Sequence, residues 1–516
     1  MPAQRRRRRR DAPAAGEESG SNDVSVLHHL QEIVGSAAGV LRLLPFSHPP
    51  TAEDIKAQLL GDDLETAALS LPDGTADVVY LGSLVNKKRL WEEVLDPLLT
   101  RTVAVDALPG SKRLVTMEAI LRQMLLGWVI LFPPGRMPVG LPLKGLQQRS
   151  VDEPTTEREI IGPKEALVED LETNIGLVRN RLRDPALRVQ MHIVGTRSRT
   201  RVALLYLDQV ASSELVARTQ RGLPTVQIDF VRTAADVAEV IFGRSLTPFP
   251  LYEETERPDR FAAALASGRI GLIVEGSPFG LLVPVTFMEF QKDAESALPG
   301  PIISVYVRTL RLLGLFLSTA APGLYVAILT ANPGVLPLPL ALTLSTTRFA
   351  VPYPVATEAL IMLLVVDILA EATTQSSGAI GNTLAIVGTL IIGQMMVQAH
   401  LASSLLMIIV SGSIMGSYLT LKFSFSYALR IWKYVIVLLS AFAGLIGWFT
   451  GFLLLLVHLA SLKSAGVPYL SPLGPFRPYD LTHYGLWQPS RGNQRLRPGM
   501  WRAQDLVRQP KRGRVR

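Results

Sequence analysis

The stretch WKYVIVLLSAFAGLIGWFTGFLLLLVHLASL, from Trp432 to Leu462, decides the fold class of this chain. It holds one lysine near its start and no Arg, Asp or Glu, and it exceeds the roughly 20 apolar residues that cross a bilayer. We therefore interpret it as the last membrane span of an integral membrane protein. Gly444, Gly447 and Gly451 would let neighbouring helices approach closely.

The apolar character extends upstream from this stretch to about Leu312. From Met1 to about Pro301 the sequence contains frequent charged residues and turn-forming residues, as in a soluble protein. The whole chain of 516 residues is 48% hydrophobic, which is high for a soluble protein. The sequence therefore predicts an α/β cytoplasmic N-terminal region followed by an α-helical polytopic membrane domain over 302–463.

Other segments of the membrane domain have the composition of spans or of shorter membrane-associated pieces. They are 312–331, 335–349 (interpreted as re-entrant), 356–370, 380–397 and 401–421. Arg308 and Arg311 should mark the cytoplasmic end of the first span. Pro322 and Gly323, together with Gly381, are candidate hinge residues, with plain helix packing as the alternative.

Polar side chains within these segments are candidates for an ion pathway. A carboxylate at membrane depth costs about 2.5 to 3.5 kcal/mol on insertion scales, so it should face a protein interior or water. Glu358, Asp367 and Glu371 are such carboxylates, the last two lying four residues apart, and Gln394 and Gln398 add amides. The alternatives are that the carboxylates anchor helix ends at the headgroups and that the amides only join helices.

The soluble half divides into two α/β units, 26–147 and 148–301. In the first, a strand at 76–81 precedes a helix at 85–99; in the second, a strand at 202–208 precedes a helix at 212–221. Aligning Tyr80 with Tyr206 brings apolar residues of both units into register, which indicates two related subdomains. The alternative is that any two such units look alike at this level.

Two further elements are expected in the second unit. Residues 164–183 have helical spacing, with Pro163 at the first turn. Residues 269–274 form an apolar strand that ends in a turn.

The chemistry expected of this chain is not catalytic. There is no cysteine, the seven histidines form no HExxH pattern, and no phosphate loop, nucleophile elbow or dinucleotide fingerprint occurs. The acidic and basic residues around Arg179 and Arg181 are suited to ion pairs or a subunit interface rather than to nucleic acid. We therefore expect no enzyme activity, no cofactor, no metal and no nucleic-acid partner.

Basic tails carry much of the net charge of +8. Residues 1–25, with Arg5 to Arg10, are expected to be a disordered tail, and 464–516 a basic C-terminal tail. Attraction to anionic lipid is the sharper alternative for the arginines. No apolar segment follows Arg10 as in a signal peptide, so we expect a cytoplasmic N-terminus.

Four stretches, in order along the chain, resemble one known family. EREIIGPKEALVEDLETNIGLVRNR (157–181) resembles a signature of the spore germination receptor A-subunit family (GerA), and 255–259, 268–278 with 284–287, and 458–472 agree with it. The residues that carry the likeness are Glu157, Gly162, Pro163, Glu169, Asp170, Asn174, Arg179, Arg181, Glu256, Arg257, Pro258, Asp259, Gly268, Pro278, Pro468 and Tyr469. The chain departs from the family pattern after Ala370, where the family has Arg and Pro.

The resemblance implies a function in spore germination. By this resemblance, the chain is similar to the A subunit, which joins a transporter-like B subunit and a lipoprotein C subunit in the spore inner membrane. Nutrients trigger the receptor, and A subunits are thought to form homo-oligomers that conduct ions. The rival expectation is a non-conducting scaffold that assembles the receptor with its B and C subunits.

The number of membrane crossings is left open by the charge pattern. The Arg-rich C-terminus favours an inside tail and an even number of crossings. Lys422, Arg430 and Lys433 would then fall outside, so the two indications conflict. We expect both termini inside.

Overall fold

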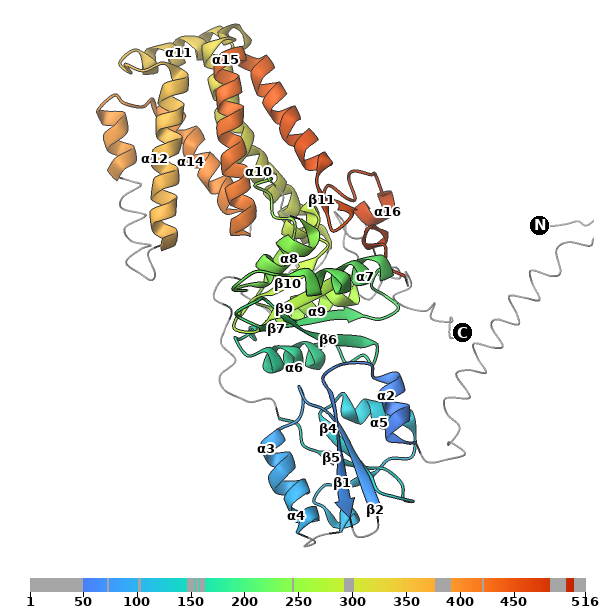
Figure 1. The fold of residues 1–516 in the computed structure, drawn as a ribbon. Helices are drawn as coiled ribbons and strands as arrows, with labels where there is room; N and C mark the ends of the chain where they lie inside the picture. The colour runs from blue at the N-terminus through green and yellow to red at the C-terminus, as the bar shows by residue number, and fades with distance from the viewer. Residues whose placement is uncertain are drawn as a thin grey trace, which may run out of the picture.

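A computed structural model describes residues 50–71, 74–100, 104–145, 154, 157, 163–243, 246–291, 301–375, 391–419, 422–482 and 498–504. Two sheet-containing subdomains and a helical region follow one another along the chain (Figure 1). The helical region is described from Pro301 onward. The predicted fold class is confirmed.

The first subdomain is a five-stranded antiparallel sheet with helices on both faces. Its strands are β1 (Leu64–Leu71), β2 (Gly74–Leu81), β3 (Lys112–Arg113), β4 (Trp128–Phe132) and β5 (Val139–Pro142), in the order β1-β2-β4-β5-β3. Its helices are α2 (Ala52–Gln58), α3 (Lys87–Leu90), the π-helical η1 (Trp91–Leu95), α4 (Asp96–Leu99), the 3-10 helix η2 (Val105–Ala107) and α5 (Met117–Met124). One face packs on Leu90, Val94 and Leu98, and the other on residues of α2 and α5.

The second subdomain repeats this design. Its strands are β6 (Leu187–Val194), β7 (Thr200–Leu207), β8 (Glu253–Thr255), β9 (Ile270–Val274) and β10 (Gly280–Val283), in the order β6-β7-β9-β10-β8. Its helices are α6 (Leu171–Arg181), α7 (Ser213–Gly222), η3 (Leu223–Thr225), α8 (Ala234–Phe242), α9 (Pro258–Ala266) and η4 (Phe287–Gln291). Helices α6 and α9 cover one face, and α7 and α8 cover the other.

The two sheets agree in register as well as in strand order. Leu81 of β2 pairs with Leu64, and Leu207 of β7 pairs with Leu187, so Tyr80 and Tyr206 are equivalent, as the sequence alignment predicts. The pairings of the other strands extend this correspondence. Equivalent pairs are Gly127 and Gly268, Trp128 and Arg269, Lys112 and Glu253, and Arg113 and Glu254.

The helix expected at 164–183 is shorter than predicted. Helix α6 begins only at Leu171, because the Asp170 side chain caps it by accepting from the Thr173 amide at 2.8 Å. Pro163 therefore lies outside the helix and not in its first turn. The extended segment before α6 is held by Asn174, whose buried side chain bonds to the backbone of Val168.

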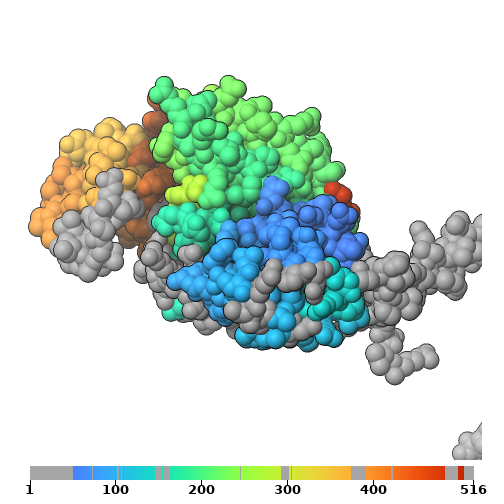
Figure 2. All heavy atoms as spheres, turned by 60° about the horizontal axis from the view of Figure 1, so that its bottom comes forward, coloured from blue at the N-terminus to red at the C-terminus, as the bar shows by residue number. Residues whose placement is uncertain are grey.

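A buried ion pair joins the two subdomains. Arg179 of α6, with 1% of its side chain exposed, donates to both oxygens of Asp63, and Ser83 donates to the same carboxylate at 3.1 Å. Figure 2 shows the first subdomain in blue packed directly on the second in green. Arg179 is thus an interface residue, and its ion pair is with Asp63 and not with Glu169, Asp170 or Glu172.

The helical region contains α10 (Pro301–Thr330), η6 (Pro333–Val335), α11 (Leu338–Arg348), α12 (Val355–Gln375), a helix at 391–398, α14 (Ser404–Tyr418) and α15 (Phe423–Ser461). By length and composition, Val305–Thr330 and Ser424–Ser461 can cross a membrane, and Ser404–Tyr418 is a shorter apolar helix. Together with the soluble sheets, these helices indicate a membrane protein with a soluble N-terminal region. Arg308 and Arg311 lie buried at the base of α10.

The prediction of one span over 432–462 is wrong, because α15 is two antiparallel helices. Its backbone leaves the helical conformation at Ala443 and Gly444, and Gly444 has φ +56°. Leu445 then donates its amide to the side chain of Asn332 at 2.9 Å, which fixes the turn. A Cβ on Gly447 would overlap the backbone of Leu439, so the two arms, 423–442 and 445–461, pack at close range.

Both arms of this α15 hairpin end at the second subdomain (Figure 1). Phe425 at its start and Leu459 at its end share one apolar cluster with Phe249, Phe287 and other residues of that subdomain. Lys422 lies directly before the first arm, and Arg430 and Lys433 lie within it.

The segment after the hairpin packs on the second subdomain where it is described. It contains β11 (Lys463–Ser464), β12 (Val467–Pro468), α16 (Pro478–Asp480) and η9 (Gly499–Trp501). Trp501 is 1% exposed and lies against the guanidinium of Arg269 at 5.4 Å. Tyr469 is fully buried. These parts of the predicted basic tail are structural elements, because their large apolar side chains contact the sheet domain.

Candidate functional site

Glu358 lies buried at the end of the helical region that is farther from the sheets. Its carboxylate accepts from Arg348 at 3.1 Å and from the amide of Ser403. The exposed fraction of its side chain is 0%. Glu358 therefore joins α11, α12 and the start of α14, which is the buried, paired arrangement expected of a membrane carboxylate.

Asp367 and Glu371 lie on the face of α12 that meets the first arm of the α15 hairpin. Asp367 accepts from Lys433 at 3.1 Å and from Tyr434 at 2.7 Å. Glu371 accepts from Tyr427 at 2.8 Å. The structure thus brings these two candidates together on one face and gives each a partner on the same neighbouring helix.

A small polar cavity adjoins the Asp367 ion pair. Its volume is about 10 Å³, roughly that needed for one water molecule, and serine side chains from three helices line it. These include Ser318, Ser413 and Ser426. Ser413 donates to the carbonyl of Ser318 at 2.8 Å, which connects α14 to α10.

Gln394 and Gln398 are both exposed, four residues apart on the helix at 391–398. Neither has a hydrogen-bond partner within the described parts of the chain. They do not meet Glu358, Asp367 or Glu371 in this structure. Their place in an ion pathway stays a prediction.

The candidate hinge residues lie in a continuous helix where they are described. Helix α10 runs through Pro322, and a Cβ on Gly323 would lie 2.7 Å from Ile436 of α15. Close packing thus explains Gly323. Gly381 lies outside the described residues, and bending at these positions stays a prediction.

The family-motif residue Glu157 connects the soluble half to the helical region. Its carboxylate pairs with Lys422, directly before α15, and accepts from Thr255 at 2.7 Å. Its backbone amide donates to Glu256 at 2.7 Å. Lys422 also donates to the carbonyl of Glu254 at 2.9 Å. Glu157 and Glu254 thereby fix the first foot of the α15 hairpin.

A second buried network underlies this junction. Glu253 of β8, 1% exposed, pairs with Arg260 and with Arg269, the latter at 2.7 Å. Arg269 also lies 3.7 Å from the carboxylate of Glu289, close to the start of the helical region. The network holds β8, α9 and η4 together, because a buried charge requires a close partner.

The remaining motif residues have structural positions. Pro258 is the first residue of α9, and Arg257 before it pairs with Asp259 at 2.7 Å. Gly268 has φ +102°, which favours glycine. Tyr469 accepts from the Phe287 amide at 2.8 Å, joining the segment after α15 to the second subdomain.

The other motif positions also serve the second subdomain, apart from one outside the described residues. The backbone carbonyl of Glu169 accepts from the amide of Gly276, and Arg181 forms an ion pair with Glu165. Pro278 lies between β9 and β10, and Pro468 of β12 pairs with Lys463 of β11. Gly162 lies outside the described residues.

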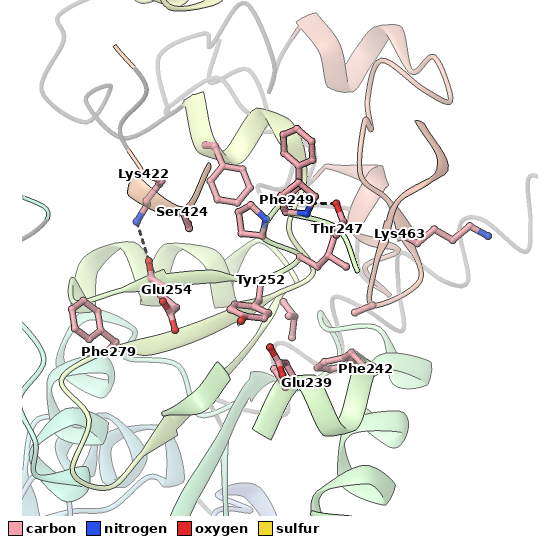
Figure 3. Close-up of a pocket in the computed structure, with 18 of the residues that line it drawn as sticks. Glu239, Phe242, Thr247, Phe249, Tyr252, Glu254, Phe279, Lys422, Ser424 and Lys463 are labelled. Carbon is pink, nitrogen blue, oxygen red and sulfur yellow. Dashed lines mark hydrogen bonds between the residues drawn. The ribbon is translucent and has the colours of Figure 1, made fainter. Parts of the chain in front are cut away.

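A cavity of about 490 Å³ opens beside the Glu157–Lys422 pair. It is lined by α8, by 247–252 and β8, and by both feet of the α15 hairpin. Figure 3 shows the ring of Tyr252 between the carboxylates of Glu254 and Glu239, while Lys463 points away. We call this space the junction cavity.

Sequence reasoning missed the partners that complete these sites. Asp63, Lys422 and Lys433 are far along the chain from the residues they bind. For Lys433 the available signal was a lysine about two and a half helical turns inside the apolar segment that starts at Ser424, because such a charge needs a carboxylate. In the described ranges, no three His, Asp or Glu side chains are placed to hold a metal.

Comparison with known proteins identifies the family. The family model described as "Bacillus/Clostridium GerA spore germination protein" matches residues 54–499. Spore germination protein KA of Bacillus subtilis is 32% identical over 77% of this chain and 76% of its own length. Spore germination protein XA of Bacillus anthracis is 36% identical over 67% of this chain and 70% of its own.

One solved structure also resembles part of this chain. The N-terminal domain of the A subunit of the Bacillus megaterium spore germinant receptor GerK3 is 22% identical, with a TM-score of 0.35, over 47% of this chain and 98% of that one. The family match itself includes both sheet subdomains and the helical region. This chain belongs to the GerA spore germination protein family.

Proposed function

We propose that this chain is the A subunit of a nutrient germinant receptor in the inner membrane of a spore. Its partners would be a transporter-like B subunit and a lipoprotein C subunit. The proposal rests on the family match over 54–499, which spans the soluble and helical regions. It assigns no catalytic step to the soluble half. Spores of a deletion strain should lose their germination response to at least one nutrient.

We further propose that several copies assemble into an ion-release pathway. The observation that carries this step is the pair Gln394 and Gln398, which share one exposed helix face and lack partners in the described ranges. An amide that faces lipid loses its hydrogen bonds to water, at a cost of about 1 to 3 kcal/mol in proteins. A water-filled path between copies would satisfy both side chains.

In this proposal the three carboxylates set the position of α12. Glu358 ties one end of the helix to α11 and α14, and Asp367 and Glu371 tie the other part to the α15 hairpin. Nutrient binding to a partner would favour an open arrangement through contacts that differ between the two states. Bending at Pro322, Gly323 or Gly381 would accompany that change.

The second candidate is a scaffold that assembles the receptor and does not conduct. One observation favours it: each of Glu358, Asp367 and Glu371 already has a partner, so these charges are not free to attract ions. A scaffold needs only the ties between helices. Ion flux separates the two candidates.

Conductance of the purified chain in lipid bilayers is the decisive measurement. In the pathway proposal, the wild type carries a cation current that Gln394→Leu combined with Gln398→Leu reduces at least about tenfold. Ser345→Ala on α11 is the matched control, because among the described residues this exposed hydroxyl bonds to the carbonyl of Ala341 in its own helix. A silent wild type that still binds its partners would favour the scaffold.

The sidedness of the chain is a separate part of the proposal. We place the soluble subdomains and the segment after α15 on the cytoplasmic side, because both feet of the α15 hairpin contact the second subdomain. The chain has no cysteine, so single cysteines can be introduced cleanly. Ser345→Cys should react with an impermeant reagent only from the outside, and Ser70→Cys, at an exposed position of β1, should react only from the cytoplasmic side.

A further inference from the structure

The junction cavity has the size of a small-molecule site. Its volume of about 490 Å³ falls within the roughly 300 to 1,000 Å³ that is usual for ligand pockets. The second subdomain forms one wall, and both feet of the α15 hairpin form another (Figure 3). A ligand bound there would therefore contact the soluble and helical regions together.

The net charge of the cavity wall is negative. The ammonium of Lys422 is matched by the carboxylate of Glu157. Lys463 is exposed and points away from the cavity (Figure 3). Glu239 and Glu254 remain, and within the described ranges neither carboxylate has an ion-pair or hydrogen-bond partner.

The surroundings of Glu254 make its negative charge energetically unfavourable. Burial by the surrounding protein, followed by the negative charge of Asp236, raises the pKa of Glu254. Asp236 itself accepts from the amide of Arg232 and lies 3.7 Å from that arginine's guanidinium, so it is occupied within α8. A cation bound beside Glu254 would offset both the burial of its charge and the repulsion from Asp236.

Aromatic side chains line the cavity beside the two carboxylates. Tyr252 lies between the two carboxylates, and Phe242 and Phe279 flank them (Figure 3). Aromatic faces attract cations and also cover apolar groups, with cation contacts contributing about 0.5 to 2 kcal/mol. The wall thus offers carboxylates that attract a positive charge and aromatic rings that can cover an apolar group.

We propose that the junction cavity binds a small molecule that carries a protonated amine on an apolar body. The amine would lie against the ring of Tyr252, which stands between Glu239 and Glu254, and the apolar part would lie against Phe242 or Phe279. Free organic amines and the ethanolamine headgroup of a lipid share this chemistry. The site does not include the candidate ion-pathway residues, so it is independent of conduction.

The test measures binding to the full chain in phosphatidylcholine nanodiscs by isothermal titration calorimetry. The probes are phenethylammonium and its uncharged analogue 2-phenylethanol, which share the same ring and chain. Phenethylammonium should bind at least about tenfold more tightly, because only it can satisfy the carboxylates. Equal affinities for the two probes would overturn the proposal.

Variants locate the site. Glu254→Gln and Glu239→Gln should each weaken phenethylammonium binding at least about fivefold. Glu118→Gln is the matched control, since Glu118 is an exposed helical carboxylate in the first subdomain. Thermal unfolding of each variant checks that it is folded. Unchanged affinity in both cavity variants would refute the site.

Lipid composition distinguishes the two sources of the amine. If the natural occupant is a lipid headgroup, nanodiscs with phosphatidylethanolamine should weaken phenethylammonium binding by competition. If it is a free amine, the affinity should be the same in both lipids. Either result supports amine recognition. Binding of a lysine-rich peptide without any binding of phenethylammonium would contradict it.

Discussion

The first and second subdomains have the same strand order and register, yet they differ where the second meets the rest of the chain. Trp128 in the first corresponds to Arg269 in the second, and Arg113 corresponds to Glu254. The second also has α8, where the first has only the short η2. The two subdomains thus share one sheet design. In the second, the charges on the edge strand β8 and the additional helix α8 adapt this design to contact the helical region.

The largest expected effect concerns the ion pair between the subdomains. Arg179→Met would leave the buried Asp63 with only the hydroxyl of Ser83, so the free energy of unfolding should fall by about 3 to 5 kcal/mol. Arg181→Met, at a half-exposed pair, should cost at most about 1 kcal/mol. Urea unfolding of the full chain, followed by tryptophan fluorescence, measures both. Equal effects would show that the subdomains do not depend on this pair.

The next effect separates equivalent positions of the two sheets. Arg269→Met removes one of the two arginines that neutralise Glu253 and also the contact with Trp501, so a loss of about 2 to 3 kcal/mol is expected. Trp128→Phe, at the equivalent position, should cost less than about 1.5 kcal/mol. Thermal unfolding compares the two. A larger loss for Trp128→Phe would reverse our assignment of the buried network.

A pair of glycines gives a smaller and more local test. Gly127 (φ +86°) and Gly268 (φ +102°) are equivalent, and alanine at either should cost about 1 kcal/mol or more. Only at Gly268 would the new Cβ lie 3.0 Å from Ala503. Hydrogen exchange of 498–504 should therefore accelerate in Gly268→Ala and remain unchanged in Gly127→Ala. Acceleration in both would mean that the effect is global.

The smallest expected effect is the pH dependence of folding stability that Glu254 causes. Because the folded pKa of Glu254 is raised, ionisation of this carboxyl opposes folding, and its contribution to stability falls as pH rises from the ordinary glutamate pKa through the raised value. Glu254→Gln should therefore stabilise the chain at neutral pH by roughly a few tenths of a kcal/mol, since water in the cavity screens the charge.

This difference between Glu254→Gln and the wild type should vanish below about pH 4, where the wild-type carboxyl is protonated in both states. Thermal midpoints at several pH values measure it. Arg113→Gln, at the equivalent position of the first subdomain, is the control and should show no such dependence. Destabilisation by Glu254→Gln at neutral pH would indicate an ion pair there.

Local sequence patterns identified one strand of the first sheet, β2, and two of the second, β7 and β9. The strands around Tyr80 and Tyr206 are recognisable because β-rich apolar runs end at turn residues, and the alignment of these two tyrosines holds in the structure. The start of α6 was also readable, since Asp170 has the character of a helix cap. There the apolar spacing of 164–183 outweighed the capping signal in our prediction.

Long-range features could not be read in the same way. The pairs Glu157–Lys422 and Asp63–Arg179 join residues far apart in sequence, and periodicity does not specify which charges meet. The α15 hairpin was missed because lipid-facing composition is the same before and after a reversal. Its total length, about twice what one crossing needs, was the signal available.

The α15 hairpin has a mechanical consequence. Both of its feet rest on the second subdomain, whereas its turn at Gly444 lies at the opposite end of arms that measure about 25 to 30 Å at 1.5 Å per residue. If the feet moved rigidly with that subdomain, a rotation of about 5° would displace the turn by roughly 2 to 3 Å, comparable to the helix shifts of known switching proteins. A small rotation of the second subdomain would thus become a larger sideways displacement at the far end of the helical region.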